Sequence, residues 1–226
     1  MTNPLPREIL GVVWDFDGVL MPDSEQVNIA AVVKTFTDLH LPPLTSGEVV
    51  SIPGRSSKVF IPELLRARGV GSEEDAEVVS FNRKNYDVIW PGKATMAPRL
   101  TETILCLTHV GTVLALATTN RKLIIDRFLT SVLPIPNPFR VIVAGEDVRN
   151  HKPHPEVYQL VATRLDIHPS KLLAVEDTAI GVRSAKVAGL WCAAIPNSFT
   201  KFQDFSEADY RLRSLHEILT ITGGTK

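Results

Sequence analysis

The sequence lacks the residue patterns of several common protein classes. It has two cysteines, Cys106 and Cys192, in apolar surroundings and without a CxxC spacing, so we expect reduced, buried thiols without a redox role. The six histidines form no HxH or HxxxH pairing with acids, which argues against a zinc site. Kinases, dehydrogenases and serine hydrolases are disfavoured because no GxxxxGK[ST], GxGxxG or GxSxG motif occurs.

Charge and hydrophobic runs are also modest. The net charge of -1 gives no electrostatic reason to expect nucleic acid or an anionic membrane as partner. No apolar run approaches the roughly 20 residues that span a bilayer, and the first residues, MTNPLPREIL, lack the order of a signal peptide. A composition of 44% hydrophobic and 22% charged residues is typical of a globular enzyme. We therefore expect a cytoplasmic protein.

Alternating apolar and amphipathic segments predict the fold. Short β-branched, apolar runs occur at residues 9–14, 112–117, 139–144, 172–175 and 191–195. Between them, helical periodicity covers residues 100–110, 123–133, 156–165 and 179–188. Strands that alternate with helices imply a Rossmann-like, doubly wound parallel sheet, an α/β fold.

One long segment interrupts this alternation. Residues 22–97 carry helical patterns at 25–40, 58–68 and 73–89 and no convincing strand. Prolines and glycines punctuate the segment and mark the return to the sheet. We therefore expect an α/β core domain formed by residues 1–21 and 98–226, with a helical domain of residues 22–97 inserted after the first strand.

The first candidate site follows the first strand, where Asp15 and Asp17 are separated by one residue and followed by Gly18. An acidic turn at the end of a strand explains this pattern as well as chemistry does. In the chemical interpretation the chain turns at Asp17, which presents its backbone carbonyl to a metal while its carboxylate faces the substrate.

Two further clusters follow later strands. The hydroxyls and amides of Thr118, Thr119 and Asn120 suit a phosphate group, although a plain helix N-cap explains them equally well. Lys152 lies among prolines in His151-Lys152-Pro153-His154-Pro155. A lysine in a stiff segment is held in place to neutralise a phosphate and an attacking carboxylate, although most surface lysines are merely solvated.

The fourth cluster is the acid pair Glu176 and Asp177, directly after the fourth strand and before a helix. Acids that open a helix favour its dipole, which is the simpler explanation. Acids close to Asp15 would repel one another unless a cation joined them, and carboxylate oxygens suit Mg²⁺. All four clusters follow predicted strands, and ligands of parallel sheets bind at the carboxyl ends of the strands.

The order of these motifs resembles the haloacid dehalogenase superfamily, in the subgroup of β-phosphoglucomutase and phosphoglycolate phosphatase. The matching residues are Asp15-Phe16-Asp17-Gly18-Val19-Leu20, Thr118, Lys152-Pro153-His154-Pro155 and Glu176-Asp177-Thr178 with Gly181 and Gly189. The resemblance extends from about residue 9 to 197, and the helical insertion falls where this family places its cap domain. Two departures are one extra residue at the hinge into the cap, and Pro98-Arg99 in place of the usual Pro-Gly.

The resemblance implies a role for each matching residue. Asp15 would be the nucleophile that forms an aspartyl-phosphate, and Asp17 the acid that protonates the leaving oxygen and later activates water. Thr118 would bind the phosphoryl group and Lys152 would stabilise its charge. Mg²⁺ would be held by Asp15, the Asp17 carbonyl, Glu176 and Asp177, one of the last two acids reaching the metal through water in some relatives.

The sequence therefore predicts a Mg²⁺-dependent phosphatase acting on a small phosphorylated metabolite, such as a sugar phosphate or a phosphoglycolate-like compound. Alternatives are a β-phosphoglucomutase-like sugar-phosphate mutase and a catalytically idle, ligand-binding relative. Candidate substrate-binding residues are Thr119, Asn120, Gly54, Arg55 and Lys58.

Overall fold

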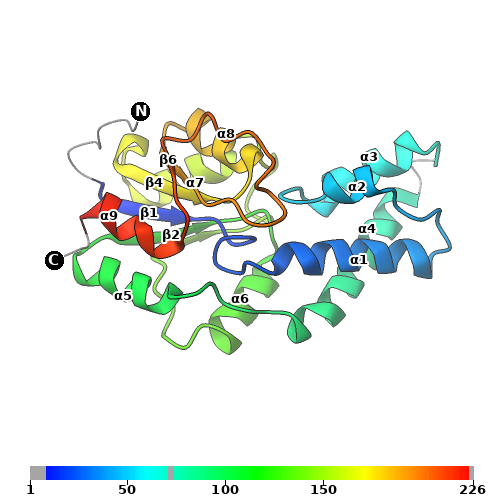
Figure 1. The fold of residues 1–226 in the computed structure, drawn as a ribbon, viewed down its shortest axis with the longest axis horizontal. Coiled ribbons are helices and arrows are strands. Elements are labelled where there is room, and N and C mark those ends of the chain that lie inside the picture. Colours follow the sequence, from blue (N-terminus) through cyan, green and yellow to red (C-terminus); the bar gives the residue numbers. More distant parts are fainter. Residues whose placement is uncertain (1–8, 71–73, 224–226) are drawn as a thin grey trace. The chain divides into compact units, whose positions relative to one another are not determined.

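The computed structural model describes residues 9–70 and 74–223 (Figure 1). The chain divides into two compact units, an α/β unit of Met1–Pro22 with Thr95–Lys226 and a helical unit of Asp23–Ala94. Residues 1–8, which we examined for a signal peptide, and residue 73, where we expected a helix to begin, lie outside the described residues. No helix in the described part of the chain is long and apolar enough to cross a membrane.

A six-stranded parallel sheet forms the centre of the α/β unit. Its strands are β1 (Gly11–Trp14), β2 (Val113–Ala117), β3 (Val141–Val143), β4 (Leu172–Glu176), β5 (Trp191–Ala194) and β6 (Tyr210–Arg211). In the order β3-β2-β1-β4-β5-β6, the strands after β1 are first added on one side of β1 (β2, β3) and then on its other side (β4, β5, β6), so the order reverses between β1 and β4. Such a reversal is where ligands bind in open α/β sheets.

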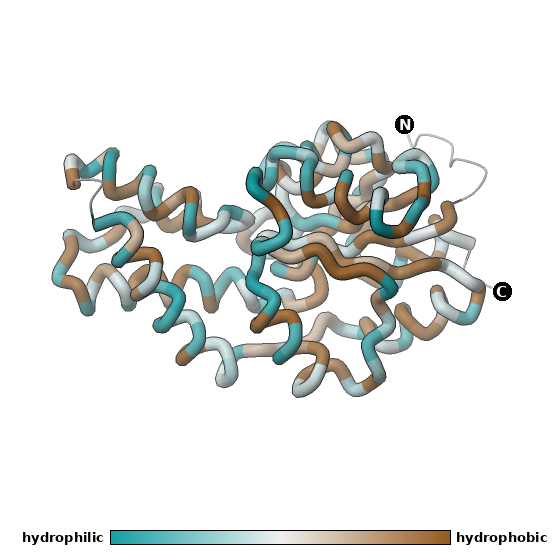
Figure 2. Tube along the Cα trace, turned by 180° about the vertical axis from the view of Figure 1, so that it is seen from behind, coloured by the Kyte–Doolittle hydropathy of each residue, from teal (hydrophilic) through white to brown (hydrophobic). Residues whose placement is uncertain are grey.

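Helices cover the sheet, and the strands are mostly apolar because the central strands are buried on both faces; Glu176 at the end of β4 and the exposed Arg211 of β6 are exceptions. The helices of this unit are α5 (Leu100–His109), α6 (Lys122–Ser131), α7 (Glu156–Leu165), α8 (Ala179–Val187) and α9 (Ile218–Thr222), with 3₁₀ turns at Pro169–Lys171 and Leu215–Glu217. Figure 2 shows the hydrophobic residues of the strands at the centre of this unit. All four residues of β1 are buried, so the residues that follow β1 start from a fixed position.

The helical unit has its own apolar core. Its elements are α1 (Ser24–Asp38), α2 (Ser46–Val50), α3 (Ser57–Ala67), α4 (Asp75–Ile89) and a 3₁₀ turn at Trp90–Gly92. Buried side chains from several of these elements pack together, among them Val32 and Phe36 of α1 and Ile61 of α3. An amphipathic helix that buries one face against its neighbours in this way gains most of its stability from packing.

The predicted α/β fold is confirmed, but the sequence patterns missed three short elements. We predicted neither β6, which has two residues, nor the helices α2 and α9, which have five each. Elements of this length show no measurable hydrophobic period. For α2 a capping box was available as a signal, because the Thr45 side chain accepts from the Glu48 N–H while Glu48 bonds back to Thr45.

Candidate active site

Lys152 forms the centre of a charged group at the carboxyl ends of β1, β2 and β4. Its ammonium donates hydrogen bonds to Asp15 Oδ1 at 2.7 Å, to Glu176 Oε1 at 2.6 Å and to the Ala117 carbonyl at 3.0 Å. The Asp15 N–H in turn donates to the Val175 carbonyl at 3.0 Å, which continues the pairing of β1 with β4. Three neighbouring strands therefore fix one lysine and two carboxylates, and only 4% of the Lys152 side chain is exposed.

Tyr158 of α7 is a member of this group that sequence reasoning missed. Its hydroxyl donates to Glu176 Oε1 at 2.5 Å, and its ring centroid lies 5.0 Å from Lys152 Nζ, a cation-π distance. The side chain is fully buried. Its place six residues after Lys152 gave no chemical signal, because a tyrosine on the buried face of a helix is usually part of the core.

Three buried carboxylates lie beside the lysine. Asp15, Glu176 and Asp177 each offer an oxygen within 4.8 Å of the others. Asn197 Nδ2 donates to Asp177 Oδ2 at 2.7 Å. Gly18 has a φ of +79°, and a Cβ there would lie 1.9 Å from the same Asp177 oxygen, so the turn after Asp17 passes directly over this carboxylate. Closely spaced, buried oxygen donors fit a hard divalent cation such as Mg²⁺.

The pKa values follow from this crowding. Burial raises the pKa of Asp15 to about 8, against the lowering effect of Lys152, while Glu176 and Asp17 add to the rise. Burial alone would lower the pKa of Lys152, but Asp15 and Glu176 hold it above its usual range. One ammonium does not balance three carboxylates, so a bound cation would favour the ionised form of Asp15.

The Thr118-Thr119-Asn120 segment lies beside Asp17. Thr118 is fully buried, and its Oγ1 accepts from the Asn120 N–H at 2.9 Å. The N-cap of α6 is Arg121, which forms no side-chain cap, so the N-cap interpretation of this segment is wrong. Asn120 Nδ2 donates to both Asp17 oxygens at 3.1 Å. The backbone at Thr119 packs so closely on Gly145 that a Cβ on that glycine would lie 2.3 Å from the Thr119 carbonyl oxygen.

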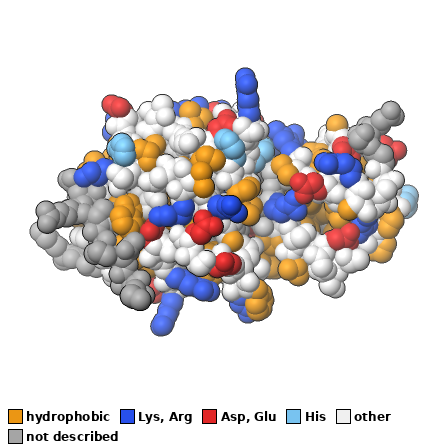
Figure 3. Space-filling view, turned by 90° about the horizontal axis from the view of Figure 1, so that it is seen from above, with side chains coloured by type: hydrophobic (Ala, Val, Ile, Leu, Met, Phe, Trp, Pro, Cys, Tyr) orange, Lys and Arg blue, Asp and Glu red, His pale blue; other side chains and the backbone are white. Residues whose placement is uncertain are grey.

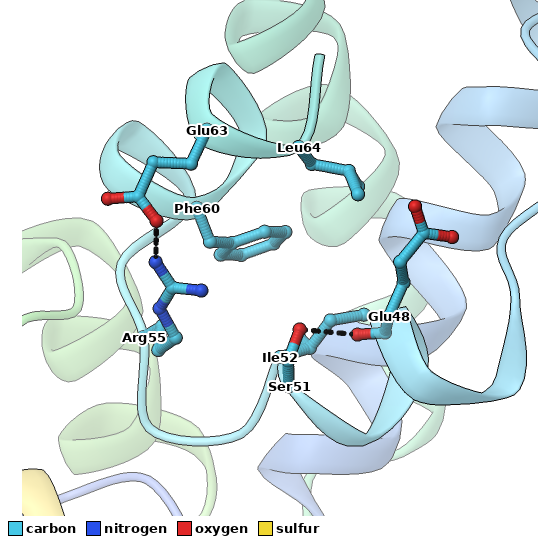
Figure 4. Close-up of a pocket in the computed structure, with 7 residues that line it drawn as sticks. All are labelled: Glu48, Ser51, Ile52, Arg55, Phe60, Glu63 and Leu64. Carbon is cyan, nitrogen blue, oxygen red and sulfur yellow. Dashed lines mark hydrogen bonds and ion pairs between the residues drawn. The ribbon is translucent and has the colours of Figure 1, made fainter. Parts of the chain in front are cut away.

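The other candidate substrate-binding residues belong to the helical unit. Arg55 lines a pocket with Glu48, Ser51, Ile52, Phe60, Glu63 and Leu64, and its guanidinium pairs with Glu63 (Figure 4). The Gly54 N–H donates to Glu25 Oε1 at 2.9 Å, and Lys58 is exposed. Substrate binding by Gly54, Arg55 and Lys58 therefore stays a prediction.

Charged side chains of both signs lie on the surface of the described residues. On the face drawn in Figure 3, Lys and Arg side chains are interspersed with Asp and Glu side chains. This mixture agrees with the net charge of -1.

Comparison with known proteins identifies the family. The chain is 29% identical to protein CbbY of Rhodobacter capsulatus, over 94% of this chain and 96% of that protein. It is 28% identical to phosphoglycolate phosphatase of Escherichia coli strain K12, over 96% and 94%. A crystal structure of CbbY from Rhodobacter sphaeroides in complex with phosphate aligns with a TM-score of 0.83 at 26% identity, covering 95% of this chain and 99% of that one. Residues 12–195 match the haloacid dehalogenase-like hydrolase family, and the chain belongs to it.

Proposed function

We propose that the protein is a Mg²⁺-dependent phosphatase that hydrolyses a small phosphorylated metabolite through an aspartyl-phosphate on Asp15. Its family and its phosphatase relatives make it a phosphoric monoester hydrolase. The observation that carries the proposal is the buried pairing of the Lys152 ammonium with Asp15 and Glu176. This pairing holds a carboxylate nucleophile and a cation next to each other in fixed positions.

In the first step an Asp15 oxygen attacks phosphorus and the bond from phosphorus to the ester oxygen breaks. Asp17 transfers its proton to the departing oxygen, and Lys152 stabilises the negative charge on the phosphoryl group. In the second step the Asp17 carboxylate takes a proton from water, which attacks phosphorus and releases Asp15 and phosphate. Thr118, at the end of β2, is our candidate for hydrogen bonding to the phosphoryl group.

The acid cluster is our candidate for the metal site. Asp15, Glu176, Asp177 and the backbone carbonyl of Asp17 would hold Mg²⁺. A bound Mg²⁺ would neutralise charge on the transferring phosphoryl group, and it would keep Asp15 ionised. Glu176 also helps to hold Lys152 in place, because Glu176 Oε1 accepts hydrogen bonds from both Lys152 and Tyr158.

For the substrate we propose a sugar phosphate or a phosphoglycolate-like compound. One CbbY variant from Rhodobacter sphaeroides was crystallised with xylulose-1,5-bisphosphate and aligns with a TM-score of 0.81 at 26% identity. Another relative is a phosphoglycolate phosphatase. We further propose that residues 22–97 act as the cap domain, with Gly54, Arg55 and Lys58 as substrate contacts from the cap and Thr119 as a contact from the core.

The test is phosphate release from a panel of phosphorylated metabolites, with and without Mg²⁺. We expect Asp15→Asn to abolish turnover while the protein stays folded, because the amide keeps the shape of the carboxylate but cannot form the acyl phosphate. Asp126→Asn is the matched control, since Asp126 is an exposed residue of α6, and it should keep wild-type activity. Substantial phosphate release by purified Asp15→Asn protein would show that another group is the nucleophile.

A further inference from the structure

We infer that Asn120 is a positioning residue whose side-chain amide holds the Asp17 carboxyl group in the direction needed for proton transfer. This inference rests on the proposed function and changes the expected role of Asn120 from a substrate contact to a support for the acid. It concerns only residues of the α/β unit.

The contact between the two side chains is symmetrical. Asn120 Nδ2 lies 3.1 Å from Asp17 Oδ1 and 3.1 Å from Asp17 Oδ2. The two residues are 103 positions apart in the sequence and come together because β1 and β2 are adjacent parallel strands. An amide nitrogen that faces both oxygens fixes where the carboxyl group sits, beyond what the backbone of the turn determines.

Asn120 itself is held by further hydrogen bonds. Its Oδ1 accepts from the Arg121 N–H at 2.8 Å, which leaves the NH₂ end of the side chain for Asp17. Its backbone N–H donates to Thr118 Oγ1 at 2.9 Å, and its carbonyl accepts from the Gly145 N–H at 2.8 Å. Gly145 packs so closely on this segment that a Cβ would lie 2.3 Å from the Thr119 carbonyl oxygen. These contacts therefore hold the Asn120 side-chain NH₂ group, which donates to Asp17, in a fixed position.

Asp17 is proposed to act when the bond from phosphorus to the ester oxygen breaks. At that point a proton on an Asp17 oxygen passes to the departing oxygen, and Asp17 is left as a carboxylate. A proton transfer of this kind depends on the distance and direction between acid and acceptor. Asn120 touches neither the phosphorus nor the leaving group in this scheme. Replacing Asn120 should therefore slow the first chemical step most for substrates whose leaving group needs a proton.

The leaving group supplies the test. An alkyl phosphate releases a strongly basic alkoxide and needs the acid, whereas 4-nitrophenyl phosphate releases a stable phenolate and needs it little. The quantity to measure is kcat/KM for both esters, because it reports only the steps up to release of the leaving group. The alkyl ester is the best substrate of the wild-type panel.

Two variants of Asn120 separate positioning from loop structure. Asn120→Asp keeps an oxygen for the Arg121 N–H but loses the donor to Asp17, and Asn120→Ala loses both. Asn137→Ala is the matched control, because Asn137 Oδ1 accepts from the Phe139 N–H at 2.9 Å in an exposed loop. Thermal unfolding of every variant shows whether the fold is retained.

We expect both Asn120 variants to lower kcat/KM for the alkyl ester about tenfold more than for the aryl ester, a part of the ~10²–10⁴-fold that general acids contribute. Asn137→Ala should leave the ratio unchanged. Equal losses for the two esters, or a loss in Asn120→Ala that Asn120→Asp restores, would overturn the inference. If the wild-type protein hydrolysed neither ester, the proposed phosphatase function would be wrong as well. Failure of the Asn120 inference alone is therefore distinguishable from failure of the proposed function.

Discussion

Gly18 shows how one residue controls the geometry of the acid cluster. Its φ of +79° favours glycine, and a Cβ at this position would lie 1.9 Å from Asp177 Oδ2 and 2.4 Å from Asp177 Cγ. This distance is far shorter than any real contact of a Cβ atom. Asp177 would have to move, although Asn197 Nδ2 holds the same oxygen at 2.7 Å.

We therefore predict that Gly18→Ala weakens Mg²⁺ binding by about tenfold or more, a value in the range seen for groups that orient metal ligands. Binding is measured from the rise in Tm with increasing Mg²⁺ concentration, which gives the Mg²⁺ affinity without any activity assay. Gly111→Ala is the control for backbone strain alone, because Gly111 has a φ of +82° and no atom within 4 Å of its Cβ position. Equal Mg²⁺ requirements in the two variants would show that Asp177 is not displaced.

Asp177 itself gives a second prediction at the residue scale. EDTA should remove activity and Mg²⁺ should restore it, and Asp177→Ala should raise the Mg²⁺ requirement because the site loses a charged, hard ligand. The measurement is a Mg²⁺ titration of phosphate release. Glu207→Ala, at an exposed position, is the control and should titrate like the wild type. An unchanged titration of Asp177→Ala would place the metal elsewhere.

At the scale of elements, Arg68 joins α3 to the segment that leads into α2. Its guanidinium donates to Glu48 Oε1 at 2.8 Å and to the Pro42 carbonyl at 2.6 Å, and it lies over the Phe36 ring at 5.2 Å. The Glu48 side chain also accepts from the Thr45 N–H at 2.7 Å. The hydrogen bonds from Arg68 and Thr45 lower the pKa of Glu48 from 4.5 to about 2.

The sign of the pH dependence follows from this shift. Between about pH 2 and pH 4.5 the folded protein binds fewer protons at Glu48 than the unfolded chain, so this group makes stability rise with pH. Its contribution is fully present above about pH 4.5 and is lost as the pH falls through about 2. We expect Glu48→Gln to lower the free energy of unfolding by about 1 kcal/mol at neutral pH, since the pair is partly exposed to solvent.

The measurement is urea unfolding of wild type and Glu48→Gln at neutral pH and at a pH between the two pKa values. The difference in the free energy of unfolding should shrink on acidification. Glu77→Gln, at an exposed position of α4, is the control and should show little difference at either pH. A difference that stays constant or grows on acidification would contradict the assignment to the Glu48 carboxylate.

Elements also show what sequence reasoning can predict. Alternating apolar and helical periods predicted β1 to β5 because each is a parallel strand made mostly of apolar residues. The rule that ligands bind at the carboxyl ends of the strands predicted that Asp15, Lys152 and Glu176 would lie together. Tyr158 and Asn197 could not be predicted, since their partners are fixed by the packing of α7 and of the loop after β5. No local period or spacing encodes such contacts.

At the scale of the whole molecule, the open choice is between hydrolysis and phosphoryl transfer within a sugar. A mutase must retain a bisphosphate intermediate, which requires a cation for the second phosphate. By resemblance, β-phosphoglucomutases carry a histidine where this chain has Asn28 and an arginine where it has Ser57. Asn28 lies in α1 and Ser57 is the first residue of α3. Neither supplies a positive charge.

Two nearby cations, Arg55 and Lys58, are the candidates to replace that arginine. The guanidinium of Arg55 is already paired with Glu63, so it would have to exchange one carboxylate for a phosphate, and the exposed Lys58 offers an ammonium instead of a bidentate guanidinium. We therefore predict that water takes the phosphoryl group from Asp15. The test is incubation with β-glucose 1-phosphate and a trace of the 1,6-bisphosphate, with glucose 6-phosphate and free phosphate measured together. Asp15→Asn is the control, since both reactions would need this carboxylate. We expect phosphate release to exceed isomer formation; glucose 6-phosphate that forms faster than phosphate is released from every substrate of the panel would establish a mutase instead.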